Sequence, residues 1–490
     1  MRNWAGLIFL ALIHSAAADE VRVVGEPSQS EPPAIPIPRA SATNQPVVSL
    51  PSPDALPAME ASDAKPVPVK DDAPLLSLKW NDGVEIATKS KDFRYHIGGR
   101  THFDSAWFSA PDSVQNGPGG TGPIQDGSTV RRARVRIDGA MYEVVEWRME
   151  FDFTAAIANG NSAFDAAGLT DFYVELVKIP TLGALRIGNM KEPYGFEHLT
   201  SDRFLDFIER SPNYDAFAER FCLGYTPGAM LHNTFDDQRG TWWVGMFHDT
   251  NTPFGFGVGD QHYAWDARAT YLPLCDDCGE RWLHVAASVS HRNLNADRIR
   301  MRTRPSLRSG PGPLTPLLAD TGNLAATIQD LANVELVAAI GPWTWQSEYI
   351  ATWVWDASTA PATGPGTPLG NLFFSGWYTQ LLYFLTGESR PYNHQNANMD
   401  RLRPLRNAKW GDDDDGSCHG WGAWQIGARF SHTDLRDGGV GAVIDDCTLG
   451  LNWYLNPNVK IQANYIVTHR SAAQAEGWIN GFGTRVAIDF

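Results

Sequence analysis

Apolar and polar residues alternate along many short stretches of the chain. In "TVRRARVRID", residues 129–138, Arg132, Arg134 and Arg136 fall on one side of an extended strand, and Val135 and Ile137 fall on the other. One face of this strand is therefore charged and the other is apolar. For a single strand, the solvated face of a soluble sheet is the simpler interpretation, so the rest of the chain has to decide.

Segments of this kind, about ten residues long and bounded by turn residues, recur along the chain. We predict sixteen strands, near 94–104, 129–142, 145–155, 170–179, 182–190, 226–236, 240–249, 263–272, 281–292, 332–341, 343–356, 371–385, 421–434, 443–455, 457–469 and 481–490. Short and long connections alternate between them, as periplasmic turns and extracellular loops do in outer-membrane barrels. The pattern predicts an all-β fold, a 16-stranded antiparallel transmembrane β-barrel.

The charged faces must then line the interior of the barrel. In "VEWRMEFDF", Trp147, Met149 and Phe151 share one face, and Glu150 and Asp152 share the other. An arginine that faces lipid at mid-bilayer costs about 2–4 kcal/mol, so several on one strand cannot face hydrocarbon.

One connection breaks the rhythm. Residues 386–420 are long but fall on the periplasmic side by strand parity. We expect this segment to fold under or into the pore.

The start of the chain predicts export and a tether. Residues 1–18 combine Arg2, the apolar run "AGLIFLALI" and the small-residue end "SAAA", as in a signal peptide. Residues 19–75 are rich in Pro, Ala and Ser and predict a disordered linker, which can contact the cell wall. We therefore divide the chain into 1–18, 19–75 and a porin-like barrel domain over 76–490.

The end of the chain is typical of an outer-membrane protein. Apolar residues alternate through "GFGTRVAIDF", and the last residue is Phe490. Such a strand is the signal by which the barrel-assembly machinery recognises its clients. The prediction is a multi-pass barrel in contact with outer-membrane lipid, with both termini periplasmic.

Other classes of function find little support. The chain contains no GxSxG, HExxH or GxxxxGK[ST] motif, so we expect no enzyme, no catalytic residue and no cofactor. An outer-membrane lipase would need a Ser and a His paired on the outer wall, and nothing in the sequence singles out such a pair. The net charge of −16 gives no reason to expect nucleic acid as a partner. Cys275 and Cys278 in "CDDC" can close a small disulfide, whereas a metal site would need further ligands, and none is predicted.

Several separated stretches resemble one known family. They are "RRARVRIDG", "LRIGNMKEPYGFEHLTSDRFLDFIERS", "NVELVAAIGPWTWQSEYI", "YFLTGESRPY" and "TLGLNWYLNPNVKI". In order and spacing they are similar to the phosphate-selective porins O and P. The resemblance implies a barrel, typically a homotrimer, whose third extracellular loop folds inward as a constriction. That loop is about 191–225, and "HLTSDRFLDFIERS" predicts a short helix over 198–211 with Phe204, Phe207 and Ile208 on one face.

The resemblance also implies basic residues at the constriction. Family positions in the loop match Arg203 and Arg210, and wall positions match Arg131 and Arg132. The residues predicted to line the anion pathway are Arg100, Arg131, Arg132, Arg134, Arg136, Lys191, Arg203, Arg210, Arg220 and Arg268. Arg292, Arg300, Arg302 and Arg304 are further candidates, each of which can instead be an ion-paired wall residue.

A narrow aqueous pore with fixed guanidinium groups concentrates anions and repels cations. The prediction is a channel for passive diffusion of small anions, phosphate or related oxyanions. Two alternatives stay open: a non-selective or oligosaccharide-permeable porin, because Asp and Glu also face the lumen, and a plugged barrel that acts as an anchor or adhesin.

Overall fold

The computed structural model of the chain describes residues 76–154, 168–218, 224–248, 262–276, 279–294, 297–310, 315–360, 365–410 and 420–490. The described residues all belong to one compact unit, Asp71–Phe490. The predicted signal peptide, the predicted tether and Cys278 lie outside the described residues.

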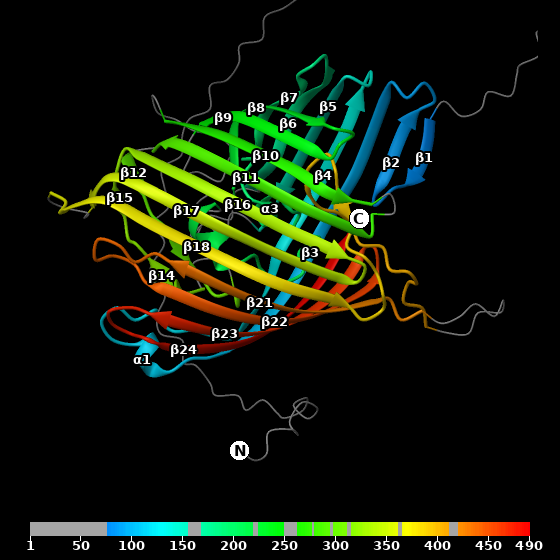
Figure 1. Ribbon diagram of the computed structural model, residues 1–490. Helices are drawn as coiled ribbons and strands as arrows, with labels where there is room; N and C mark the ends of the chain where they lie inside the picture. The colour runs from blue at the N-terminus through cyan, green and yellow to red at the C-terminus, as the bar shows by residue number, and fades with distance from the viewer. Residues whose placement is uncertain are drawn as a thin grey trace, which may run out of the picture. The chain divides into compact units, whose positions relative to one another are not determined.

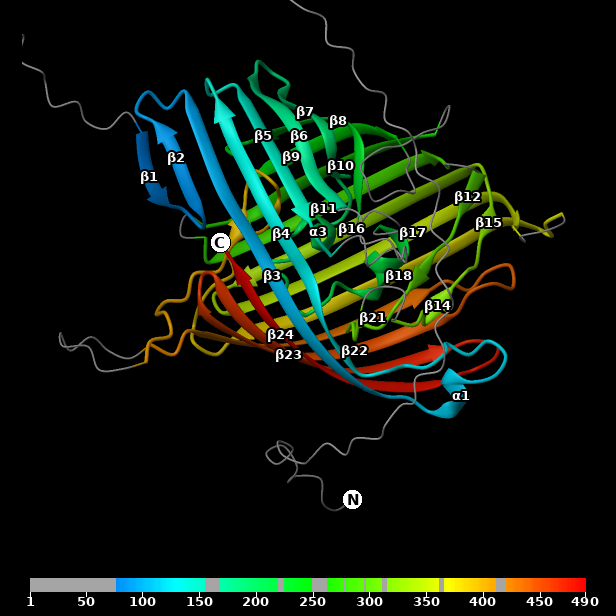
Figure 2. The same ribbon diagram turned by 180° about the vertical axis from the view of Figure 1, so that it is seen from behind.

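Sixteen antiparallel strands form a closed barrel (Figure 1, Figure 2). They are β3 (Phe93–Ser109), β4 (Gly127–Met141), β5 (Val145–Asp152), β6 (Gly168–Ile179), β7 (Gly183–Lys191), β8 (Tyr225–Phe235), β9 (Gly240–His248), β10 (Tyr263–Cys275), β11 (Arg281–Asn293), β16 (Ile328–Ile340), β17 (Trp343–Thr359), β18 (Pro368–Phe384), β21 (Ala423–Asp434), β22 (Val443–Asn456), β23 (Val459–Ser471) and β24 (Gly477–Asp489). Pairing of β24 with β3, from Asn480 with Ser109 to Asp489 with Arg100, closes the ring. Each of the sixteen predicted segments overlaps one barrel strand, so the predicted fold class is confirmed.

The alternation along each strand separates an apolar outer face from a polar inner face. On β3, Phe103 and Trp107 are 48% and 46% exposed, whereas Arg100 and Asp104 are buried. The same division recurs on β24, where Phe482 and Val486 are exposed. An outer surface of exposed aromatic and aliphatic side chains suits contact with lipid tails.

Short connections lie at one end of the barrel. They are residues 142–144, 180–182, 236–239, 341–342 and 457–458. Most long connections lie at the opposite end, as the sequence predicted. Small elements lie at both ends of the barrel. The hairpin of β1 (Leu76–Trp80) and β2 (Val84–Thr88) pairs with the start of β3. The others are α1 (Asp112–Gln115), β12 (Arg298–Ile299), β13 (Arg302–Thr303), β14 (Ala319–Asp320), β15 (Leu324–Ala325), β19 (Tyr392–Asn393) and β20 (Asn398–Met399).

The connection between β7 and β8 lies inside the barrel. We call its described part, residues 192–218, the inner loop. It contains α3 (Phe196–Leu199), which lies within the ring of strands in both views, and α4 (Pro212–Phe217) (Figure 1, Figure 2). No helix of the described residues is long and apolar enough to cross a membrane.

The prediction of a helix over 198–211 is wrong. Residues 201–211 are not helical, and the two short helices flank them. The physical reason is that strand side chains use the backbone carbonyls of this segment: Lys460 donates to the carbonyl of Leu205 at 2.7 Å, and Asn452 donates to that of Asp206 at 2.7 Å. These tertiary hydrogen bonds take the place of the helical ones.

The predicted apolar helix face is absent for the same reason. Ile208 packs with Ala106 and Ile466 of the wall and with Leu307 of the β11–β16 connection. Phe207 instead lies under the guanidinium group of Arg429, 4.7 Å from its ring centre. The apolar residues of this segment therefore contact separate parts of the barrel.

The connection between β18 and β21 reaches the inner loop from the end with the short turns. Asn398 donates to the carbonyl of Leu199 at 2.8 Å, and Arg390 donates to the carbonyl of Phe204. Met399 packs in one apolar cluster with Phe196. This agrees with the expectation that 386–420 folds into the pore, for the described part up to residue 410.

Candidate functional site

The arginines of β4 point into the barrel. Arg132 and Arg134 are buried, whereas Val135 and Ile137 are exposed on the outer surface. Arg136 also faces the interior, where it pairs with Asp138 at 2.7 Å. The faces predicted from the alternation are therefore confirmed.

A β-bulge brings Arg131 to the interior beside Arg132. His102 pairs with Arg132, and the next pair along the ladder is Phe103 with Val130, so Arg131 is the extra residue. A bulge redirects the side chain at its position. Arg131 donates two hydrogen bonds to Glu209 of the inner loop, at 2.9 and 3.0 Å.

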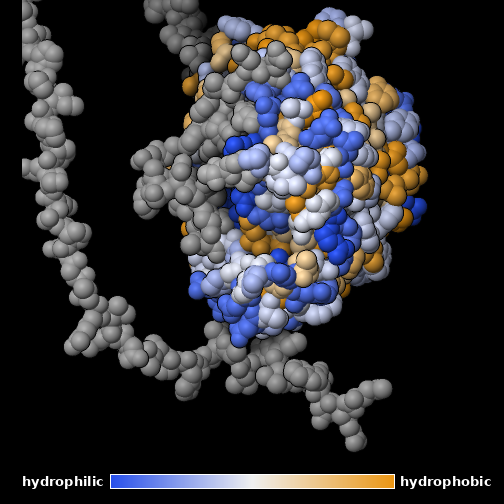
Figure 3. Space-filling model, turned by 90° about the vertical axis from the view of Figure 1, so that its left-hand side faces the viewer, coloured by the Kyte–Doolittle hydropathy of each residue, from blue (hydrophilic) through white to orange (hydrophobic). Residues whose placement is uncertain are grey.

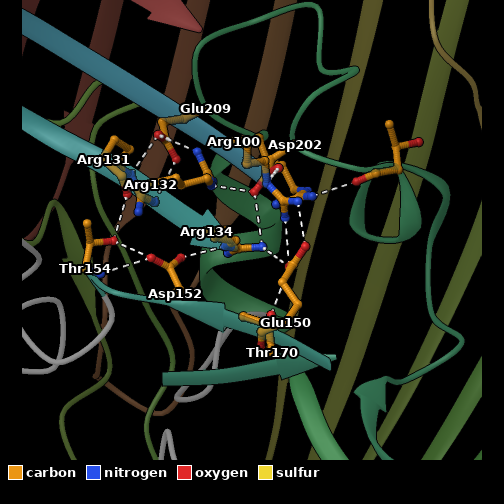
Figure 4. A network of polar contacts seen from close by, with 12 residues as sticks. Arg100, Arg131, Arg132, Arg134, Glu150, Asp152, Thr154, Thr170, Asp202 and Glu209 are labelled. Carbon is orange, nitrogen blue, oxygen red and sulfur yellow. Dashed lines mark hydrogen bonds and ion pairs between the residues drawn. The ribbon is translucent and has the colours of Figure 1, made fainter. Parts of the chain in front are cut away.

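Asp202 of the inner loop lies between three arginines of the wall (Figure 4). One carboxylate oxygen is 2.6 Å from Arg100 Nε, and the other is 2.6 Å from Arg132 Nε and 3.4 Å from Arg134 Nη1. Burial alone would raise the pKa of Asp202, but the three guanidinium groups hold it well below its usual range. Asp202 is therefore an anion that ties the inner loop to β3 and β4.

Glu150 and Asp152 of β5 face the same arginines. Arg100 donates to both oxygens of Glu150, at 2.8 and 3.0 Å. Arg134 donates from Nε to Asp152 at 2.6 Å, and Thr170 donates to Glu150 at 2.9 Å. Arg100 is thus held by both oxygens of one carboxylate and Arg134 by two carboxylates, which fixes the orientation of each planar guanidinium group.

Glu209 joins this network to the last strand. Arg485 of β24 donates to Glu209 at 2.8 Å and to both oxygens of Asp104 at 2.7 Å. Burial would raise the pKa of Glu209, but the surrounding arginines, Arg131 foremost, lower it well below the usual range. The wall network contains five arginines and five carboxylates: Arg100, Arg131, Arg132, Arg134, Arg485, Asp104, Glu150, Asp152, Asp202 and Glu209. It carries no net charge.

Glu348 of β17 anchors the other end of the inner loop. Its side chain is buried and accepts hydrogen bonds from the backbone N–H groups of Phe196, at 2.8 Å, and Glu197, at 2.9 Å. The hydroxyl groups of Tyr214 and Tyr378 donate to the same carboxylate. Each carboxylate oxygen therefore accepts at least two hydrogen bonds, and the start of α3 is held against the wall.

A cavity of about 550 Å³ lies between the wall network and the β18–β21 connection. Its lining contains twelve Lys or Arg residues and six Asp or Glu residues. The basic residues outside the wall network are Arg94, Arg136, Arg148, Arg186, Lys191, Arg203, Arg210, Arg401 and Arg403. Because the network is neutral, these residues supply the excess positive charge of the cavity.

Most of the predicted pathway residues meet at this cavity. Arg100, Arg132, Arg134, Arg136, Lys191, Arg203 and Arg210 line it. Arg210 donates within the inner loop, from Nε to the carbonyl of Glu197 at 2.8 Å. Arg268 is not among the lining residues and pairs with Glu335 at 2.8 Å. Arg220 lies outside the described residues.

A second cavity, of about 780 Å³, lies at the end with the long connections. Arg302, Arg304 and Arg470 line it together with Asp320, which Arg300 holds by a hydrogen bond at 2.8 Å. Figure 3 views this end and shows hydrophilic residues over its middle and hydrophobic residues toward its sides. The further candidates in "RIRMRTRP" thus lie beside a polar cavity, whereas Arg292 pairs with Glu192.

Several residues of the site were missed in the sequence. Asp202 and Glu209 stand in the stretch that carries the family resemblance, but their pairing with wall arginines has no local signal. Arg485 could have been predicted, because Thr484 and Val486 on either side of it face outward, so that Arg485 faces the interior from the last strand. Arg390 and Arg401 lie in an irregular connection with no periodicity to place them.

Comparisons with known proteins agree with this architecture. Residues 97–486 match the family model of the phosphate-selective porins O and P. Porin O of Pseudomonas aeruginosa is 26% identical over 421 residues, which cover 79% of this chain and 86% of that protein. A protein of Caulobacter vibrioides is 26% identical over 465 residues, which cover 91% of this chain and 83% of that protein.

Among solved structures, the chain is similar to OmpT of Vibrio cholerae at a TM-score of 0.45 and 9% identity, over 82% of this chain and 99% of that one. It is also similar to OprB of Pseudomonas putida at a TM-score of 0.43 and 9% identity, over 81% of this chain and 94% of that one. The family model spans nearly the whole barrel. The chain therefore belongs to the phosphate-selective porin O and P family and is a β-barrel porin of the outer membrane.

Proposed function

We propose that this porin passes small anions, phosphate or related oxyanions, by passive diffusion through the basic cavity beneath the inner loop. The observation that carries the proposal is the lining of that cavity, with twelve Lys or Arg residues against six Asp or Glu residues. Fixed positive charge in a narrow aqueous space raises the local anion concentration and lowers that of cations.

The cations that supply this excess differ in how freely they act on a permeating ion. Arg203 has one distant partner, Asp489 at 3.8 Å, and Arg94, which also lines the cavity, has no ion pair within the described part of the chain. By contrast, Arg132 is paired with Asp202 at 2.6 Å. We therefore assign selectivity mainly to the weakly paired cations and loop position to the wall network.

The test is the reversal potential of the purified porin in planar bilayers under a salt gradient, with Arg94→Glu as the variant. At about 8 Å in water, the interaction energy between one unit charge and a monovalent ion is about 0.5 kcal/mol. Reversing the charge changes that energy by about 1 kcal/mol, so the local anion concentration changes about fivefold. We expect anion selectivity to fall by that order at low salt, where screening is weak.

The matched control is Lys178→Glu, because Lys178 lies at the exposed end of β6, where it pairs with Glu143, and does not line the cavity. Chloride current that phosphate reduces in the wild type supports an oxyanion site. An unchanged reversal potential in Arg94→Glu would refute the assignment of selectivity to this cavity.

A pore for mixed solutes is the second candidate, because the wall network is neutral and Tyr173 and Trp243 also stand at the lumen. Swelling of liposomes in oligosaccharide solutions tests it directly. A barrel that conducts nothing would favour the anchor or adhesin instead.

For the assembled protein, we propose a homotrimer with both ends of the barrel chain in the periplasm. The first barrel strand begins and the last strand ends at the end with the short turns, which supports this orientation. The exposed apolar residues of β24 support recognition by the barrel-assembly machinery. Crosslinking in detergent and protease accessibility in whole cells test the two statements separately.

A further inference from the structure

A small cavity of about 20 Å³ lies beside the basic cavity and shares Arg203, Phe204 and Arg401 with its lining. Arg390 and Lys460 line the small cavity as well, and Asp489 is its carboxylate. The residues come from three separate parts of the chain: the inner loop, the β18–β21 connection and the last two strands. Four cations thus face one small space.

Some of the donors around this cavity have no partner. Arg390 is fully buried, yet its Nε and Nη1 groups make no hydrogen bond within the described part of the chain, and neither does Nε of Arg203. The remaining nitrogen of Arg390, Nη2, donates to the carbonyl of Phe204. Buried charged donors without acceptors are costly, so such groups normally hold a ligand or water.

The charges around the cavity do not balance. Asp489 contacts Arg401 and lies 3.8 Å from Arg203, and Asp206 lies 3.5 Å from Arg390. A third carboxylate, Asp82, contacts Arg401 at 3.1 Å but is shared with Arg403. Lys460 donates only to backbone carbonyls. Within the lining of the small cavity itself, four basic side chains stand beside a single carboxylate, that of Asp489.

We propose that this cavity binds one halide ion, which bridges the inner loop to the β18–β21 connection. A space of about 10–15 Å³ accommodates a single water molecule, so this cavity fits one particle of about that size. A monatomic anion supplies, within that volume, the acceptor that Arg390 and Arg203 lack, whereas the five heavy atoms of phosphate do not fit. The site is thus distinct from the path proposed for permeating oxyanions.

The direct test is a crystal of the porin grown or soaked in bromide. We expect an anomalous peak between Arg203, Arg390 and Lys460, lost in Lys460→Gln and kept in the control Lys178→Gln. A cavity that holds only water in bromide would overturn the proposal.

A second measurement does not depend on crystals. The thermal unfolding midpoint of the wild type, followed on gels by heat modifiability, should be higher in chloride or bromide than in gluconate at equal ionic strength. Lys460→Gln should weaken the halide dependence by at least about tenfold in concentration, because one adjacent charge is removed. Equal midpoints in halide and gluconate would contradict the site, whatever the channel conducts.

Discussion

Replacing Glu348 with Ala should release one end of the inner loop without unfolding the barrel. Glu348 lies on β17 and accepts hydrogen bonds from the backbone of α3 and from Tyr214 of α4. The β17 ladder uses backbone groups and does not depend on this side chain. The perturbation therefore acts on loop position.

The size of the effect follows from the groups left behind. Without the carboxylate, two backbone N–H groups and two tyrosine hydroxyls lose their acceptor. Each buried unpaired donor costs about 1–3 kcal/mol, and three of the four belong to the inner loop, so anchoring of the loop weakens by at least about 3 kcal/mol. Since about 1.4 kcal/mol is a factor of ten, the detached state becomes about a hundredfold more populated.

Single-channel recording in planar bilayers detects this change. We expect frequent substates, larger open-channel noise and a higher mean conductance in Glu348→Ala, because α3 no longer holds one position. Tyr378→Phe removes a single donor to the same carboxylate and should show a weaker form of the same behaviour. The anchors at Asn452 and Lys460 keep the rest of the loop in place.

The control is Glu143→Ala, which removes an exposed carboxylate from the short turn between β4 and β5. It should leave noise and conductance as in the wild type. Quiet, wild-type current in Glu348→Ala, with the variant folded on a gel, would refute the claim that this carboxylate positions the loop.

Three further outcomes follow from the assigned faces and charges. Val135→Arg should lower the free energy of unfolding in vesicles by about 2–4 kcal/mol, whereas Val135→Leu should not, and equal stability would mean that this face does not meet lipid. Asp202→Asn should raise the anion-to-cation permeability ratio about twofold, because one negative charge leaves the cavity, and a fall in the ratio would contradict this. The pKa values of Asp202 and Glu209 are lowered, so their stabilising contribution is complete above the ordinary carboxyl pKa near 4 and is lost as pH falls below it. The unfolding midpoint should be flat from about pH 5 upward and drop in acid; a midpoint that rises in acid would show the opposite linkage.

The barrel could be predicted from the sequence because its information is local. Alternation within each strand shows which residues face outward, as with Arg134 and Val135 on β4, because a charged side chain that faces lipid is costly. The inward position of Arg485 could be predicted from the same alternation.

The inner loop could not be predicted in the same way, because its conformation depends on partners far along the chain. The backbone of 201–211 satisfies its carbonyls with side chains such as Lys460 and Arg485, so helical spacing of Phe204, Phe207 and Ile208 was misleading. Arg131 faces inward through a bulge, which no period of two can reveal.

The ion pairs change how the arginines of β4 should be understood. A buried arginine held by two carboxylates gains little net stability over an apolar core, but it fixes one geometry. Arg134 contacts Glu150, Asp152 and Asp202, so its charge is cancelled where it stands while its position defines the wall. The field felt by a permeating ion then comes from cations such as Arg94, which no carboxylate holds within the described part of the chain. Loop geometry and charge selectivity are therefore set by different residues, and substitutions can change one without the other.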